Sequence, residues 1–123
     1  MVHSLREDLI FNKQENKLVQ YQVLYWHNIP VQVRAREKRE RLGKPLSPRF
    51  QAAIDHAAMA AGLTGDDAYT DAFQWSQPQE SEGSLEEVVE RVAAELEAEY
   101  KVIDWRKTVQ QIMNRPGAQG SGE

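Results

Sequence analysis

An alternation of apolar and polar side chains constrains the fold of this chain more than any other feature of its sequence. In the stretch VQYQVLYWHNIPVQVRAR, valines and tyrosines of residues 19–25 occupy every second position, and the period resumes with Val31, Val33 and Ala35. Side chains at alternate positions of a strand point to the same face of its sheet. The pattern predicts a β-hairpin, turning at residues 27–30, that buries valines and tyrosines and leaves glutamines and arginines on the other face.

Start and stop signals predict a helix after the hairpin. Ser47 and Pro48 supply an N-cap hydroxyl and a proline at the first helical position. Apolar residues recur at helical spacing from Phe50 onward, and Gly62 favours the left-handed conformation that ends many helices. Residues 64–67 repeat the capping signal and predict a second, short helix.

The second half of the chain contains the clearest helix signal, a capping box formed by Ser84 and Glu87. The helix that it predicts has an apolar stripe and a solvent side crowded with glutamates. Before this helix, the alternation of residues 73–77 predicts a third strand. After it, residues 102–114 carry a further helical pattern.

The predicted order of elements, β-β-α-β-α, indicates the α+β class. We expect a two-layer sandwich in which a small three-stranded antiparallel sheet carries the helices on one face. The expected organisation is a flexible N-terminal arm over residues 1–17, an α+β domain over 18–100, a C-terminal helix over 101–114 and a disordered tail over 115–123.

Composition excludes several classes of site. The chain has no cysteine, which excludes disulfides, thiolate zinc ligands and cysteine nucleophiles. It has neither the leader pattern of a secreted protein nor a run of about 20 apolar residues that would span a membrane. We therefore expect a cytoplasmic protein that makes no membrane contact.

The net charge of −4 conceals an uneven distribution of charge along the chain. Residues 34–49 hold seven basic residues, and residues 80–99 hold eight glutamates. Two such runs are expected to pair within the molecule. The basic run also raises nucleic-acid binding as an alternative, which the acidic total, Glu37 and Glu40 within the run, and the lack of an aromatic pair on adjacent strands all disfavour.

No set of residues specifies a reaction. His27 stands in the predicted turn without a nucleophile beside it, and His56 has no second histidine at metal-binding spacing. Paired carboxylates such as Asp66 with Asp67 fall at helix starts, where acidic residues are favoured for structural reasons. Glycine-rich phosphate loops are absent. The sequence thus predicts no catalytic residue, no metal and no cofactor, and it favours a non-enzyme without excluding an enzyme.

A docking surface is the functional feature that the residues favour. Alternation places Leu24 and Trp26 on a face that otherwise carries glutamine and arginine, and tryptophan with arginine is typical of interface anchors. We expect an interaction surface for a protein partner or a second copy of the chain. Its predicted members are Leu24, Trp26, His27, Arg34 and Arg36. The open alternative is that the N-terminal arm or the C-terminal helix covers Leu24 and Trp26 within one molecule.

Three segments resemble a known family. They are YQVLYWHNIPVQVRAR, LSPRFQAAIDHAAMAAGLTGDDAYTDAFQW and EGSLEEVVERVAAELEAEY, and the most specific parts are the YWxxIPxQV hairpin and the GLTGxDAY turn. They are similar to the small bacterial virulence factor domain, which also occurs within a larger protein called conserved virulence factor C. The resemblance covers residues 21–100, and it leaves the arm and the residues after Tyr100 outside.

The resemblance implies a phenotype and no mechanism, so it assigns no functional residue. It also implies accessory proteins of metabolism, encoded near genes of one-carbon or corrinoid methyl transfer. This suggests a second interpretation, a small-molecule-handling subunit or minor enzyme of methyl transfer. Its polar groups would be Tyr25, His27, Asp67 and Tyr69, gathered in a pocket near one end of the sheet.

Overall fold

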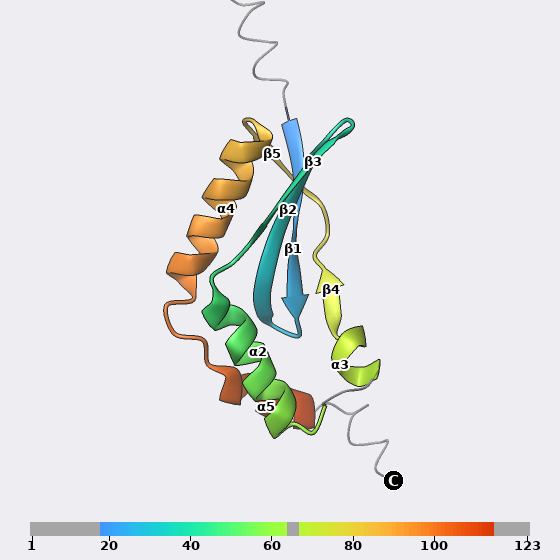
Figure 1. Ribbon diagram of the computed structural model, residues 1–123, viewed down its shortest axis with the longest axis vertical. Coiled ribbons are helices and arrows are strands. Elements are labelled where there is room, and N and C mark those ends of the chain that lie inside the picture. Colours follow the sequence, from blue (N-terminus) through green and yellow to red (C-terminus); the bar gives the residue numbers. More distant parts are fainter. Residues whose placement is uncertain (1–17, 64–66, 115–123) are drawn as a thin grey trace, which may run out of the picture.

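The computed structural model describes residues 18–63 and 67–114 (Figure 1). Its elements, in chain order, are β1 (Leu18–Trp26), β2 (Ile29–Glu37), β3 (Glu40–Pro45), α2 (Pro48–Ala60), α3 (Asp67–Asp71), β4 (Phe73–Trp75), β5 (Gln79–Glu82), α4 (Leu85–Glu99) and α5 (Trp105–Asn114). The predicted N-terminal arm and C-terminal tail lie outside the described residues. The α+β class is confirmed.

The sheet is open and antiparallel, and it has five strands. Its order is β3-β2-β1-β4, and β5 pairs with β1 beyond the end of β4. The predicted count of three strands is wrong because two short strands, β3 and β5, were not predicted. Strand β3 contains Gly43 and Pro45, which are unfavourable inside a sheet, but it is an edge strand, where a proline is tolerated.

The pairing of β1 with β2 contains one irregularity. Leu24 faces Gln32 and Tyr25 faces Pro30, so Val31 is an extra residue in β2, a β-bulge. Proline has no amide hydrogen to donate to the ladder, which makes this a natural place for the interruption. Beyond the bulge the predicted alternation is confirmed, since Val33 and Ala35 are buried and Arg34 and Arg36 are exposed.

The helices cover the face of the sheet that carries Val33 and Ala35. Helix α4 packs along β1, β2 and β3, while α2 packs on β2 and α5 packs on α2 (Figure 1). The predicted capping box of Ser84 with Glu87 is present, Pro48 begins α2, and Gly62 adopts a positive φ of 76° after α2. These local signals place the helices, and the other face of the sheet stays open.

Trp26 does not point to solvent as the alternation predicted. Its side chain is fully buried, and its indole Nε1 donates a hydrogen bond to the carbonyl oxygen of Tyr69, at 2.9 Å. Its ring also lies 6.0 Å from the ring of Tyr69, centroid to centroid. Trp26 is the last residue of β1, and the segment that contains α3 packs over this end of the strand. The solvent exposure predicted for Trp26 is therefore wrong, because a distant segment covers it.

Candidate docking surface on the open sheet face

The face of the sheet opposite α4 carries a trough of about 530 Å³. We call this face the outer sheet face. Residues that share a row across the sheet point to the same side, so the strand register defines its members. On the open part of the face they are Leu18, Gln20, Gln22, Leu24, Gln32, Arg34, Arg36, Arg41, Gly43, Pro45, Trp75, Glu80 and Glu82. Trp26 and Phe73 share the same side of the sheet at the covered end of β1. The trough is lined by the members Gln20, Gln22, Gln32, Arg34, Arg36, Arg41, Gly43 and Trp75.

Arg34 is held in a fixed position at the centre of this face. Its Nε and Nη2 atoms donate to Oε1 of Gln22, at 3.1 and 2.9 Å, and Nε2 of Gln22 donates to the carbonyl oxygen of Ser76, at 2.8 Å. The guanidinium carbon lies 3.8 Å from the ring centroid of Trp75. Within the described residues Nη1 makes no hydrogen bond, so one edge of this planar cation remains open to a ligand.

Two further arginines lie beside Arg34 and face each other. Arg36 of β2 and Arg41 of β3 are directly opposite in the register, and neither forms an ion pair with another described residue. The next pair toward the turn, Glu37 with Glu40, falls on the other face. Two residues of like charge directly opposite each other on neighbouring strands are less stable than an arginine opposite a glutamate. The hairpin of β2 and β3 thus sorts its charges by face and makes its part of the outer sheet face positive, while Glu80 and Glu82 lie on the same face at β5.

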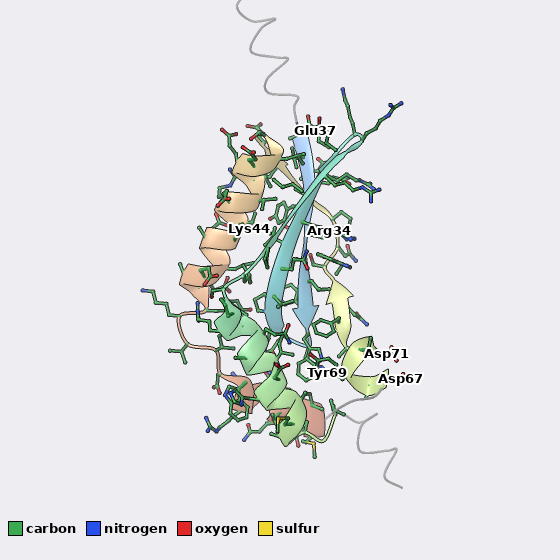
Figure 2. The ribbon with its side chains drawn as sticks, viewed as in Figure 1. Arg34, Glu37, Lys44, Asp67, Tyr69 and Asp71 are labelled. Carbon is green, nitrogen blue, oxygen red and sulfur yellow. The ribbon has the colours of Figure 1, made fainter. Side chains whose placement is uncertain are left out.

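The rest of the basic run faces elsewhere. Figure 2 shows Lys44 on the side of α4 and Arg34 on the opposite side of the sheet. Lys44 forms an ion pair with Glu90 of α4, at 3.6 Å, and Arg49 forms one with Glu97, at 3.1 Å. The predicted pairing between the basic and acidic runs is confirmed for these two residues. The run at residues 34–49 is therefore not one continuous surface.

Comparison with known proteins places the fold in a family. A family model described as "Virulence factor" matches residues 24–111. The chain belongs to the virulence factor family. No curated protein and no solved structure matches the chain. The match continues past Tyr100 into α5, so the predicted end of the similarity at Tyr100 is wrong, and α5 is part of the family's domain. This agrees with the packing of α5 on α2, which places Ile112 in the core.

The predicted interaction residues of this family member separate into two groups. Leu24, Arg34 and Arg36 lie together on the outer sheet face, where Leu24 is half-buried between Gln32 and Trp75. His27 lies in the hairpin turn with a φ of 57°, and its ring meets the ring of Trp26 edge-on with 4.5 Å between centroids. Trp26 itself is in the core. The role of the group as an interaction surface stays a prediction.

Trp75 is the residue of the outer sheet face that the prediction missed. Its strand was expected from the alternation of residues 73–77, but that alternation does not say which strand it joins. Pairing of Trp75 with Leu24 brings its indole onto the outer sheet face, within reach of Arg34. The aromatic side chain beside Arg34 on this face is therefore Trp75 of β4 and not Trp26 of β1.

The second set of predicted polar groups, Tyr25, His27, Asp67 and Tyr69, lines neither of the two hollows described for residues 18–63 and 67–114. The Tyr69 hydroxyl donates to Asp55 of α2, at 3.3 Å, and burial raises the pKa of Tyr69. Burial also raises the pKa of Tyr25, and the nearby charge of Glu99 raises it further. Figure 2 shows Asp67 on the outer side of α3, away from Tyr69. Neither the trough nor a smaller hollow of about 260 Å³ beside α5 is lined by any of the four residues.

The described residues, 18–63 and 67–114, contain no candidate metal site and no candidate membrane span. No group of three or more histidine, aspartate or glutamate side chains there is arranged to hold a metal ion. None of the helices in these ranges has the length and apolar character needed to cross a bilayer. The outer sheet face is thus the feature from which a function can be argued.

Proposed function

We propose that this member of the virulence factor family is a non-catalytic docking module that binds a protein partner through the outer sheet face. The observation that supports the proposal is the fixed position of Arg34, which Gln22 and Trp75 hold at the centre of an open trough. An arginine ordered before binding loses little conformational entropy when a partner arrives. Arginine and tryptophan are also the residues most enriched among interface anchors.

A partner of different sequence fits this face better than a second copy. A closed dimer whose axis passes near Arg34, Arg36 and Arg41 would bring these arginines against the same residues of the other copy, which repel. The acidic side of α4 lies on the opposite layer of the molecule. Docking that side onto the outer sheet face would build an open head-to-tail chain instead of a closed pair.

Charge reversal tests the proposal. The variant Arg34→Glu with Arg36→Glu changes the outer sheet face, and Lys101→Glu with Lys107→Glu changes the net charge equally on exposed residues near α5. Each protein, checked for folding by circular dichroism, is used to capture proteins from extracts of cells that naturally produce this chain. We expect the same partner with the wild type and the lysine variant and its loss with the arginine variant. Equal capture by all three would overturn the proposal.

A further inference from the structure

The outer sheet face also indicates the chemistry of its partner. Resting on the proposed docking function, we infer that this face recognises an extended acidic segment, with Arg34 and the pair of Arg36 and Arg41 binding carboxylates on one face of the segment. Four observations carry this step: the spacing of the arginines, the open edge of Arg34, the opposed pair of Arg36 with Arg41, and the lack of a side chain at Gly43.

The two cationic points of the outer sheet face are separated by more than one strand. The guanidinium of Arg34 reaches across β1 to Trp75, whereas Arg36 faces Arg41 between β2 and β3. Neighbouring strands lie about 4.8 Å apart, so the two points are about 10 Å or more apart. An extended partner presents every second side chain on one face at intervals of about 6.6 Å, so a run of alternating acidic residues keeps carboxylates on one face over this distance.

The geometry of Arg34 suits a carboxylate. Gln22 occupies the Nε edge of the guanidinium, and Nη1 is left on the open side. A planar carboxylate accepts hydrogen bonds from a planar guanidinium in a defined orientation, and such charge-assisted bonds are stronger than neutral ones. Arg34 is thus the anchor, because its position is set before the ligand arrives.

Arg36 and Arg41 form the second half of the site. The two cations face each other across β2 and β3 without an ion pair among the described residues. Like charges in directly opposite positions destabilise a sheet. A carboxylate placed between them removes this repulsion, so binding is favoured at the pair more than at a single exposed arginine.

Gly43 keeps the trough open beside Arg34. It is directly opposite Arg34 in the register, and a Cβ atom at this position would lie 3.2 Å from Nε2 of Gln32. The missing side chain leaves space on the β3 side of Arg34, bordered by the amide of Gln32. Filling this space with Gly43→Val removes no charge, so it tests the shape of the site separately from its electrostatics.

Single-stranded nucleic acid is the weaker candidate for the same charges. Platforms for single strands stack successive bases on several aromatic side chains. Of the aromatic residues that the register places on this side of the sheet, Trp26 is buried, Phe73 packs on the ring of Tyr69, and Arg34 already covers the ring of Trp75. An acidic peptide needs no stacking surface, and the glutamines of the trough can bond its backbone amides.

Two peptides of equal charge and different spacing, with an uncharged peptide as control, test the inference. Calorimetric titration of the full chain compares capped SESESES, SSEEESS and SQSQSQS with a ten-nucleotide oligouridine at low and moderate salt. We expect SESESES to bind about tenfold more tightly than the other two peptides and than the RNA. Its affinity should fall about tenfold in Arg34→Glu with Arg36→Glu, fall in Gly43→Val, and stay unchanged in Lys101→Glu with Lys107→Glu.

Four results would overturn the inference. Equal affinity for SESESES and SSEEESS would reject the spacing, and tighter binding of the RNA would reassign the face to nucleic acid. A doubling of mass by light scattering that the arginine variant abolishes would assign it to a second copy. If SESESES fails while capture from extracts still depends on Arg34 and Arg36, the acidic segment is excluded and the docking function stands.

Discussion

The guanidinium carbon of Arg34 lies 3.8 Å from the ring centroid of Trp75, although the two residues come from strands that are not neighbours. Arg34 belongs to β2 and Trp75 to β4, and β1 runs between them. The side chain of Arg34 therefore crosses the width of β1, where Gln22 holds it by two hydrogen bonds. This contact ties three strands together on the outer sheet face and orders the residue that we propose as the anchor.

The contact between Arg34 and Trp75 should be measurable as a coupling free energy. We expect a cycle of Arg34→Ala, Trp75→Ala and the double variant to give about 0.5 to 1 kcal/mol, the usual value of a cation–π contact at an exposed site. Urea unfolding followed by circular dichroism supplies the free energies of unfolding. Strictly additive effects of the two substitutions would show that Arg34 is not held by Trp75.

Glu97 of α4 is predicted to stabilise the start of α2. Its carboxylate accepts hydrogen bonds from the backbone N–H and the hydroxyl of Ser47, at 2.7 and 3.0 Å, and pairs with Arg49. The pKa of Glu97 is lowered from 4.5, and the hydrogen bond from the N–H of Ser47 is the largest cause. Because the side chain is one third exposed, we expect Glu97→Gln to cost only about 1 kcal/mol at neutral pH.

The pH dependence of this effect follows from the direction of the shift. A lowered pKa in the folded state means that the unfolded chain takes up the proton first as the solution is acidified. The stability contributed by Glu97 is therefore complete above pH 4.5 and is lost as the pH falls through its folded pKa. The difference between wild type and Glu97→Gln should shrink over this range. A difference independent of pH would contradict the assignment, and Glu95→Gln is the exposed control on the same helix.

Trp26 should behave as a core residue and not as a surface anchor. Trp26→Phe leaves space in the core and removes the donor to the carbonyl oxygen of Tyr69, so we expect a loss of about 2 kcal/mol in the free energy of unfolding. Trp75→Phe, on the outer sheet face, should cost less than about 0.5 kcal/mol. A larger loss in the free energy of unfolding for Trp75→Phe than for Trp26→Phe would contradict the burial of Trp26.

Gly83 has a positive φ of 129° immediately before the capping box of α4. A Cβ atom there would lie 2.9 Å from Oε1 of Glu87, the atom that accepts the hydrogen bond from the N–H of Ser84. Gly83→Ala should therefore strain the backbone and disturb the cap, at a cost of about 2 kcal/mol or more. Gly62→Ala strains the backbone where nothing lies within 4 Å, and about 1 kcal/mol is expected. Equal losses of stability would argue against the crowding at Glu87.

Features set by neighbouring residues in the chain could be predicted, and features set by distant ones could not. The capping box of Ser84 with Glu87 and the proline that begins α2 are complete within a few residues. The burial of Trp26 depends on Tyr69, and the strand character of residues 40–45 depends on pairing with β2. The predicted arginines of the outer sheet face were found where alternation placed them. Their aromatic partner was not, because strand register is a long-range property.

Site-specific photo-crosslinking tests the docking claim most directly. A photo-reactive amino acid is introduced at Gln20, on the outer sheet face beside Arg36, and in a second protein at Ala94, an exposed position on α4. Both proteins are irradiated in the cells that naturally produce the chain, and the products are resolved by mass. The account predicts a crosslinked protein partner from position 20 and none from position 94. A partner crosslinked from position 94 alone would contradict it.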